Sequence, residues 1–182
     1  SYNTRAAAEE MGLPVFLVQH HYAHILSCMA ENEWTTEKKV IGVSFDGTGY
    51  GTDGTIWGGE ILLADYDSFT RWGCIEPFAQ TGGDASAKEG WRIAVSLLGK
   101  IYGKENALLI IETLGLCEPK LAKLQFTMEE RGINTVQSTS AGRLFDAVSA
   151  ILDIRKSSKS TSQLRSLTRI AVSSTIEQFA NT

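Results

Sequence analysis

Residues 40–66 read VIGVSFDGTGYGTDGTIWGGEILLADY: an apolar run leads into an acid, then a stretch rich in Gly and Thr, then a second apolar run. The β-branched and aromatic residues at 39–45 predict a strand, and residues 60–64 predict a second one. Glycines between 47 and 59 permit the tight backbone conformations of a turn. We therefore predict two antiparallel strands joined by a Gly/Thr loop.

The sequence on either side of this pair predicts two more strands and a set of helices. Apolar runs predict strands at 15–18 and 68–77. Strands followed by helices are typical of a mixed α/β lobe, in which a mixed sheet is flanked by helices from the second half of the chain. Trp57, Trp72 and Trp91 are expected in its core. Helical spacing of apolar residues predicts helices at 21–33, 88–102, 105–114, 119–130 and 141–154, then a Ser/Lys-rich linker at 155–162 and one more helix in the last twenty residues.

Composition and charge exclude several classes of protein. The net charge of the 182 residues is −4 and there is no basic run, which disfavours a nucleic-acid-binding surface. The apolar stretches are far too short to span a bilayer, and the chain does not start like a signal peptide. Cys28, Cys74 and Cys117 form no CxxC pair, as is typical of reduced thiols, and the expected location is the cytoplasm.

All three histidines lie within residues 20–24, HHYAH. Residues four apart share one face of a helix, so His20 and His24 can hold one transition metal. His21 points elsewhere and is a candidate for contacting substrate. Two imidazoles do not complete a metal site, and Asp46 at a strand end is the carboxylate that could join them or hold a nucleotide-bound Mg²⁺. Packing or hydrogen-bonding roles are the structural alternative for the histidines.

The Gly/Thr loop is a candidate phosphate-binding element. Glycines permit close backbone approach, and backbone amides and Thr hydroxyls can face phosphate oxygens. The pattern is neither a P-loop nor a Rossmann fingerprint, and a hairpin turn without a ligand is the alternative. The candidate nucleotide-binding residues here are Gly47, Thr48, Gly49, Tyr50, Gly51 and Thr52.

Two further motifs are less specific. Gly82 and Gly83 precede Asp84, which either reaches the ribose of a nucleotide or caps a helix. Arg143, near the start of a predicted helix, either reaches a phosphate or carboxylate ligand or forms a surface salt bridge.

Four stretches together resemble the HypF family of hydrogenase-maturation carbamoyltransferases, in the domain related to the tRNA threonylcarbamoyl-transferase TsaD. They follow one another in family order and cover about residues 4–155. The stretches are VQHHYAHILSCMAE (18–31), residues 40–66, TGGDASAKEGWRIAVSLL (81–98) and STSAGRLFDAVSAILDIR (138–155).

The resemblance implies a lobe of the actin-like/Hsp70-like ATPase superfamily. It also implies a divalent metal (zinc, iron or magnesium) at His20, His24 and Asp46, and ATP or carbamoyl-adenylate as the nucleotide. In this family, carbamoyl-adenylate is made from carbamoyl phosphate and ATP, and its carbamoyl group passes to the C-terminal cysteine of the partner HypE during [NiFe]-hydrogenase maturation. The attacking thiolate would come from HypE, so no catalytic residue is assigned in this chain.

The chain also departs from the family pattern. Residues 1–155 are expected to form the TsaD-like lobe, whereas 156–182 do not match the family continuation and are expected to be a linker with a possible helix. We therefore expect part of a longer enzyme that is inactive alone. The alternatives are a tRNA threonylcarbamoyl-transferase-like enzyme, an O-carbamoyltransferase of antibiotic biosynthesis, or a nucleotide-binding lobe without catalysis. The HHYAH form and the long DGTGYGTDGTIWGGE run favour HypF.

Overall fold

The computed structural model describes residues 2–12 and 14–154, which form two compact units. Of these described residues, the first unit contains those up to Pro77 together with Gln137–Gly142, and the second contains Phe78–Val136 and those from Arg143 to Ile154. The helix and linker predicted beyond residue 154 lie outside the described residues.

The first unit is built on three antiparallel strands, β1 (Val40–Tyr50), β2 (Ile56–Ala64) and β3 (Phe69–Cys74). The predicted strand pair is confirmed: Val40 lies opposite Ala64 and Phe45 opposite Gly59. The predicted loop is too long, because β1 continues through the glycines as far as Tyr50. Pairing with β2 resumes at Gly49 after a shift of register, and glycine tolerates such an irregularity. Only residues 51–55 therefore remain as the connection.

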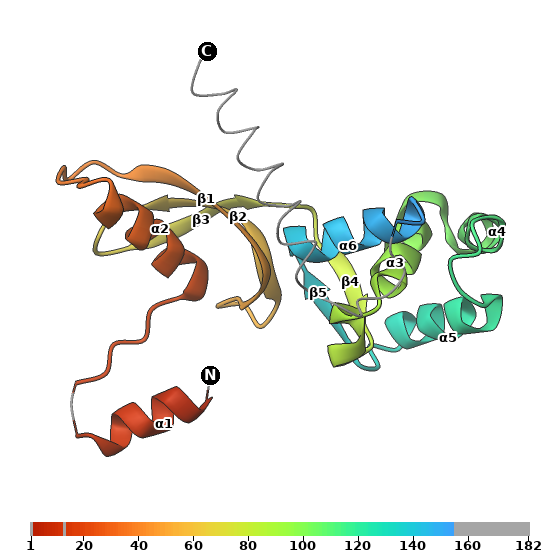
Figure 1. Cartoon of the computed structure of the whole chain (residues 1–182), viewed down its shortest axis with the longest axis horizontal. Coiled ribbons are helices and arrows are strands. Elements are labelled where there is room, and N and C mark those ends of the chain that lie inside the picture. The colour runs from red at the N-terminus through yellow and green to blue at the C-terminus, as the bar shows by residue number, and fades with distance from the viewer. Residues whose placement is uncertain (1, 13, 155–182) are drawn as a thin grey trace, which may run out of the picture. The chain divides into compact units, whose positions relative to one another are not determined.

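Helix α2 (His20–Glu31) packs on one face of β1 and β2 (Figure 1). Tyr22, Ile25 and Met29 of α2 share a buried cluster with residues of β2, including Leu62. Glycine is needed at position 42, because a Cβ there would lie 2.3 Å from Cδ1 of Ile25. The helix that covers these two strands thus comes from the first half of the chain, whereas helices of the second half pack on strand β4 (Phe78–Thr81) of the same sheet.

The prediction of a buried strand at 15–18 is also wrong. These residues belong to no helix or strand, and Phe16 is 87% exposed. An apolar run forms a strand only if a neighbouring strand pairs with it, and none in the described part of the chain does so here. Helix α1 (Tyr2–Glu10) precedes the run and was not predicted.

Strand β5 (Thr135–Ser138) makes the sheet mixed, as predicted. Its last residue, Ser138, pairs in parallel with Ile56 of β2. The N–H of Thr139, the next residue, donates to the Ile56 carbonyl at 2.9 Å. This pairing brings residues 138–140 alongside the start of β2.

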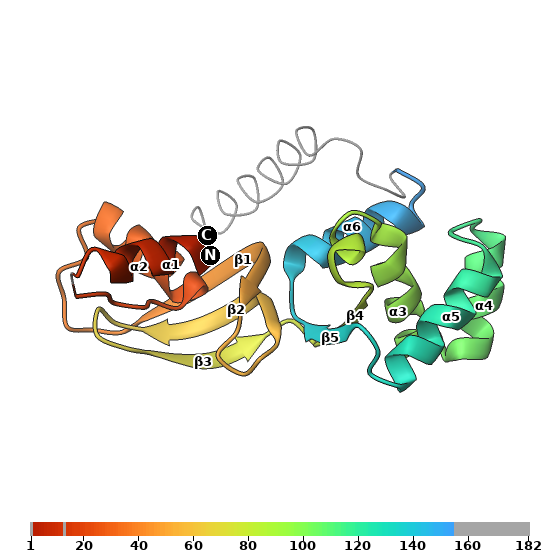
Figure 2. The same cartoon turned by 90° about the horizontal axis from the view of Figure 1, so that it is seen from below.

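The second unit is mainly helical, and its helices gather beside strand β4 (Figure 2). Its apolar core includes Phe78, Ile93, Ile111 and Phe126. The four predicted helices are confirmed, whereas β4, β5 and the short 3-10 helix were not predicted. The elements are β4 (Phe78–Thr81), η1 (Gly83–Ala87), α3 (Gly90–Tyr102), α4 (Lys104–Thr113), α5 (Pro119–Glu130) and α6 (Ala141–Ile151), the last beginning in the first unit.

The three predicted core tryptophans have different environments. Trp57 is 1% exposed, and Trp91 packs against the core of the second unit. Trp72 on β3 is 67% exposed, so its predicted burial is wrong. Among the described residues, no helix is long and apolar enough to cross a membrane.

Candidate metal and nucleotide site

The structure brings His20, His24 and Asp46 together. Nε2 of His20 lies 2.7 Å from Oδ2 of Asp46 and 3.2 Å from Nε2 of His24. One possible ligand atom from each of the three side chains lies within 4.8 Å of the others. Two imidazole nitrogens and a carboxylate oxygen are a donor set that zinc or iron accepts.

Local structure explains this convergence. His20 is the first residue of α2, and His24 follows one turn later, so both rings lie on the same side of the helix. Gln19 caps the helix, because its side-chain oxygen accepts a hydrogen bond from the Tyr22 N–H at 2.9 Å. Side chains alternate along β1, so Asp46 lies on the same side as Gly42, the side that faces α2.

The environment of Asp46 favours its charged form. Burial raises the pKa of Asp46, but the Gly47 N–H and the neighbouring His20 outweigh burial and hold it below its usual value. The Gly47 N–H donates to Oδ1 of Asp46 at 2.6 Å, which leaves Oδ2 to face His20. A metal ligand needs a deprotonated carboxylate, so this environment suits the expected role.

His21 is buried next to the candidate ligand His20, with the two ring centres 5.2 Å apart. Its side chain is 0% exposed, and Nδ1 lies 3.0 Å from Nε2 of Gln19. Burial, followed by the nearby His20, lowers the pKa of His21, so the ring is neutral at pH 7. The structure therefore gives His21 a place in the core next to the site, and the predicted substrate contact remains a prediction.

Gly49 belongs to this histidine cluster. A Cβ at position 49 would lie 2.4 Å from Cε1 of His21 and 2.8 Å from Cδ2 of His20. Packing against the two imidazoles therefore requires glycine at position 49, whether or not a phosphate binds there.

We expect Gly49→Ala to weaken metal binding, because the added methyl group pushes on both imidazoles. Overpacking a filled site costs about 1–3 kcal/mol, so the free energy of unfolding should fall as well. Gly73→Ala on β3 is the control, since a Cβ there would have only ordinary contacts at 3.7 Å. Zinc titration and chemical denaturation of both variants test this, and equal behaviour of the two would contradict it.

The other predicted nucleotide-binding residues fall into two groups. Gly47, Thr48 and Tyr50 are part of β1, and Gly51 and Thr52 start the connection to β2. Gly82, Gly83 and Asp84 lie in the second unit, where Gly82 has φ 108° and Asp84 lies in the first turn of η1. Nucleotide binding by either group remains a prediction.

Arg143 takes part in a salt bridge in the second unit. Its Nη2 lies 2.9 Å from Oδ2 of Asp146, and its Nη1 donates to the Ala87 carbonyl at 2.6 Å. The structure therefore shows the salt-bridged alternative for this side chain.

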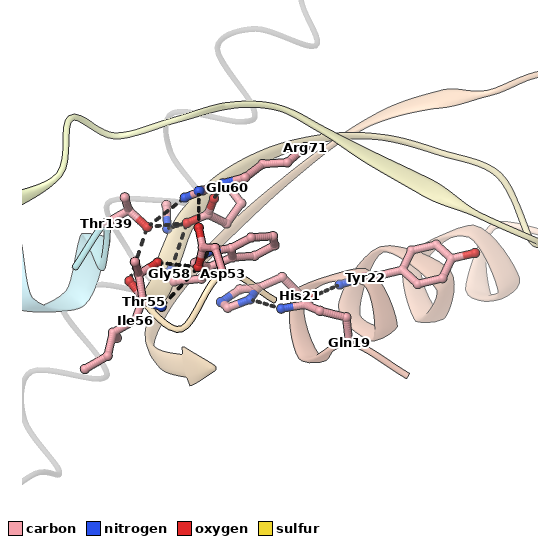
Figure 3. A network of polar contacts seen from close by, with 12 residues as sticks. Gln19, His21, Tyr22, Asp53, Thr55, Ile56, Gly58, Glu60, Arg71 and Thr139 are labelled. Carbon is pink, nitrogen blue, oxygen red and sulfur yellow. Dashed lines mark hydrogen bonds and ion pairs between the residues drawn. The ribbon is translucent and has the colours of Figure 1, made fainter. Parts of the chain in front are cut away.

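A buried network around Glu60 was missed by the sequence analysis (Figure 3). Glu60 is 0% exposed, and its carboxylate accepts from Nε of Arg71 at 2.7 Å. It also accepts from the Thr139 hydroxyl and from the N–H groups of Gly58 and Gly59 at 3.1 and 3.3 Å. The sequence did contain a sign of this network, because Glu60 is an acid in an otherwise apolar strand. It did not show which residues would pair with that acid.

The same arginine extends the network to the connection between β1 and β2. Nη1 of Arg71 lies 3.0 Å from Oδ2 of Asp53, and its guanidinium lies 4.2 Å from the ring centre of Trp57. Oδ1 of Asp53 in turn accepts from the Trp57 ring N–H at 3.0 Å and from the hydroxyl of Thr55 at 2.7 Å. This network fixes the connection that follows the candidate site.

Glu60 should make the stability of the protein depend on pH. Burial raises the pKa of Glu60, but Arg71, Thr139 and two backbone N–H groups hold it below the ordinary 4.5. A lowered folded pKa means that the stabilisation is present above about pH 4.5 and is lost as the pH falls through the folded pKa. We expect the difference in unfolding free energy between the parent and Glu60→Gln to shrink from pH 7 to pH 3.5. Denaturation at several pH values tests this, and a constant difference would contradict it.

Comparison with known proteins identifies the family and agrees with the fold. A family model described as "Carbamoyltransferase, Kae1-like Domain, second subdomain" matches residues 42–166, which defines the class of domain. A second model, "HypF Kae1-like domain", matches residues 1–31. The chain therefore belongs to the HypF family of carbamoyltransferases, and the resemblance and the α/β fold expected from the sequence are confirmed.

Relatives and solved structures cover most of this chain. Carbamoyltransferase HypF of Rhodobacter capsulatus is 40% identical over 157 residues, and the probable carbamoyltransferase HypF of Methanocaldococcus jannaschii is 39% identical over 157 residues. The matches cover 82% and 84% of this chain but 20% of each relative. The chain therefore spans about a fifth of the length of these relatives.

Two crystal structures are similar in fold. Full-length HypF in its phosphate- and nucleotide-bound form has a TM-score of 0.72 and 37% identity, over 81% of this chain and 19% of that one. The HypF of T. kodakarensis has a TM-score of 0.75 and 33% identity, over 90% of this chain and 22% of that one.

Proposed function

We propose that this chain supplies the metal- and nucleotide-binding part of a carbamoyltransferase. The enzyme would move a carbamoyl group from carbamoyl-adenylate to the C-terminal cysteine thiolate of a HypE-type protein in the cytoplasm. Family membership supports transfer of a carbamoyl group. One observation carries the site: His20 and His24 of α2 and Asp46 within β1 place three possible ligand atoms within 4.8 Å of one another.

The three side chains fit a divalent metal. Nε2 of His20 lies 2.7 Å from Oδ2 of Asp46 and 3.2 Å from Nε2 of His24. The lowered pKa of Asp46 favours the charged carboxylate that a metal needs. A bound metal would supply positive charge to phosphate oxygens and polarise the carbamoyl carbonyl. The three side chains would hold the metal ion, and with it the positive charge, beside the Gly-rich segment.

Nucleotide binding is supported by the relatives and by the sequence between Gly47 and Thr52. A HypF structure of similar fold is described as phosphate- and nucleotide-bound. In this chain the Thr48 and Thr52 side chains are exposed, next to Asp46 along the strand and its connection. Exposed hydroxyls and backbone N–H groups near a metal are suitable partners for phosphate oxygens.

The transfer step needs no nucleophile from this chain. The thiolate sulfur of the acceptor would bond to the carbamoyl carbon while the bond from that carbon to the phosphate oxygen breaks. AMP would then leave with the electron pair, and a thiocarboxamide would remain on the acceptor.

A chimera tests the proposal. This chain replaces the matched 157-residue segment of the Rhodobacter capsulatus HypF, and the chimera is incubated with carbamoyl phosphate, ATP and HypE. Mass spectrometry of the HypE C-terminal peptide should show one added carbamoyl group. Asp46→Asn should abolish the product, whereas Asp67→Asn, an exposed acid between β2 and β3, should retain it.

A folded chimera that leaves the HypE peptide unmodified would contradict the proposal. If such a chimera still binds ATP, the remaining interpretation is a nucleotide-binding domain without transfer. If it instead modifies tRNA, the threonylcarbamoyl-transferase alternative holds.

A further inference from the structure

Ser140 contacts the backbone that carries the candidate ligand Asp46. Its hydroxyl lies 3.1 Å from the carbonyl oxygen of Asp46 and 2.8 Å from that of Gly47, so it donates to these two successive carbonyls. The Gly47 N–H binds Oδ1 of Asp46 at 2.6 Å. One hydroxyl therefore restrains the Asp46–Gly47 peptide, whose N–H orients the carboxylate, and also the peptide that follows it.

Close backbone packing surrounds the same point. A Cβ at Gly58 would lie 2.6 Å from the Asp46 carbonyl oxygen and 2.9 Å from Cα of Ser140. A Cβ at Gly142 would lie 2.7 Å from Cα of Gly47. Two glycines thus allow residues 140–142 and the start of β2 to press directly on the Asp46–Gly47 backbone.

The position of Ser140 is fixed by the preceding residue. The Thr139 hydroxyl donates to the buried Glu60 carboxylate, which Arg71 neutralises (Figure 3). The Thr139 N–H also donates to the Ile56 carbonyl at 2.9 Å. Both contacts attach the segment that carries Ser140 to β2, so it cannot move away without breaking buried hydrogen bonds.

We infer that Ser140 is a positioning residue for the candidate metal ligand Asp46, and that Glu60 acts on the same ligand through Thr139. The inference deepens the proposed function, because it concerns the same metal site. Groups that orient metal ligands typically contribute about 10–100-fold to metal affinity. This role of Ser140 depends on contacts with residues almost a hundred positions away in the sequence. The sequence around Ser140 therefore could not predict it.

Metal titration of the full 182-residue chain tests the inference. We expect Ser140→Ala to lower the affinity for Zn²⁺ by about tenfold or more. Ser149→Ala, which removes a buried hydroxyl in the second unit, is the matched control and should leave the affinity unchanged. At position 139, Thr139→Val should weaken binding, whereas Thr139→Ser keeps the hydroxyl and should restore it.

A merely structural role predicts a different pattern. In that case Ser140→Ala and Thr139→Val would lower the melting temperature, but the folded variants would bind Zn²⁺ as the parent does. Equal Zn²⁺ affinities of parent and Ser140→Ala at a temperature where both are folded would overturn the inference.

A crystal structure of the Ser140→Ala variant provides a readout that needs neither metal nor activity. We expect the contact between Oδ2 of Asp46 and Nε2 of His20, 2.7 Å here, to be lost. A retained contact would overturn the inference even if the parent chain bound no metal. Carbamoyl transfer by the chimera is measured separately, so failure of the proposed function and failure of this inference are distinguishable.

Discussion

Replacing Arg71 with Met should cost the protein about 3–5 kcal/mol of unfolding free energy, because it leaves a buried carboxylate without its counter-charge. Glu60 is 0% exposed, and its carboxylate forms an ion pair with Nε of Arg71 at 2.7 Å. The same substitution also removes the contact with Asp53 and the stacking over Trp57. Chemical denaturation followed by tryptophan fluorescence measures the loss.

The matched control is an exposed ion pair. The exposed side chains of Lys104 and Glu130 form this pair, so Lys104→Met should change the unfolding free energy far less than Arg71→Met does. A double variant, Glu60→Leu with Arg71→Met, should recover part of the loss, because no unpaired charge remains buried. A loss for Arg71→Met as small as that for Lys104→Met would show that the network does not stabilise the fold.

Local patterns were sufficient for much of the fold and for the candidate ligands. His20 and His24 could be predicted to share a helix face because they are four residues apart. Asp46 could be predicted as a third ligand because it is an acid that directly follows an apolar run. The second-unit helices were equally visible, since each has its own apolar spacing. In each case the signal lies within one element of secondary structure.

Features that depend on tertiary pairing could not be predicted in this way. The glycines after Asp46 favour a loop on local grounds, but pairing with β2 keeps residues 47–50 in β1. The apolar run 15–18 had strand character, yet no partner strand exists for it in the described part of the chain. Strands β4 and β5 are four residues each, too short for a clear periodicity.

The polar contacts of the site show the same limit. Arg71 is 11 residues from Glu60, but Thr139 is 79 residues away, and Ser140 is 94 residues from Asp46. The pairing of Ser138 with Ile56 brings these residues together. A sequence pattern identifies a candidate ligand, whereas the groups that orient the ligand become visible only with the fold.

Asp46→Asn should have the largest effect on metal binding, a loss of affinity of at least about 100-fold, beyond what orienting groups typically contribute. The amide keeps the shape of the carboxylate but removes the negative charge that a divalent cation needs beside two neutral imidazoles. It also changes the hydrogen bond to His20, now 2.7 Å. Asp67→Asn makes the same chemical change at an exposed position and should leave Zn²⁺ affinity as it is in the parent.

The pH dependence of binding gives an independent check on the same ligands. Protons compete with the metal for imidazole nitrogen, so the Zn²⁺ affinity of the parent should fall as the pH is lowered from about 7 to about 5. Over this range Asp46 stays charged, because its pKa lies below its usual value, and the loss is therefore assigned to the histidines. His24→Ala should remove most of this pH dependence together with the binding. Zn²⁺ affinity that is independent of pH in the parent, or equal in parent and Asp46→Asn, would rule out His20, His24 and Asp46 as joint ligands.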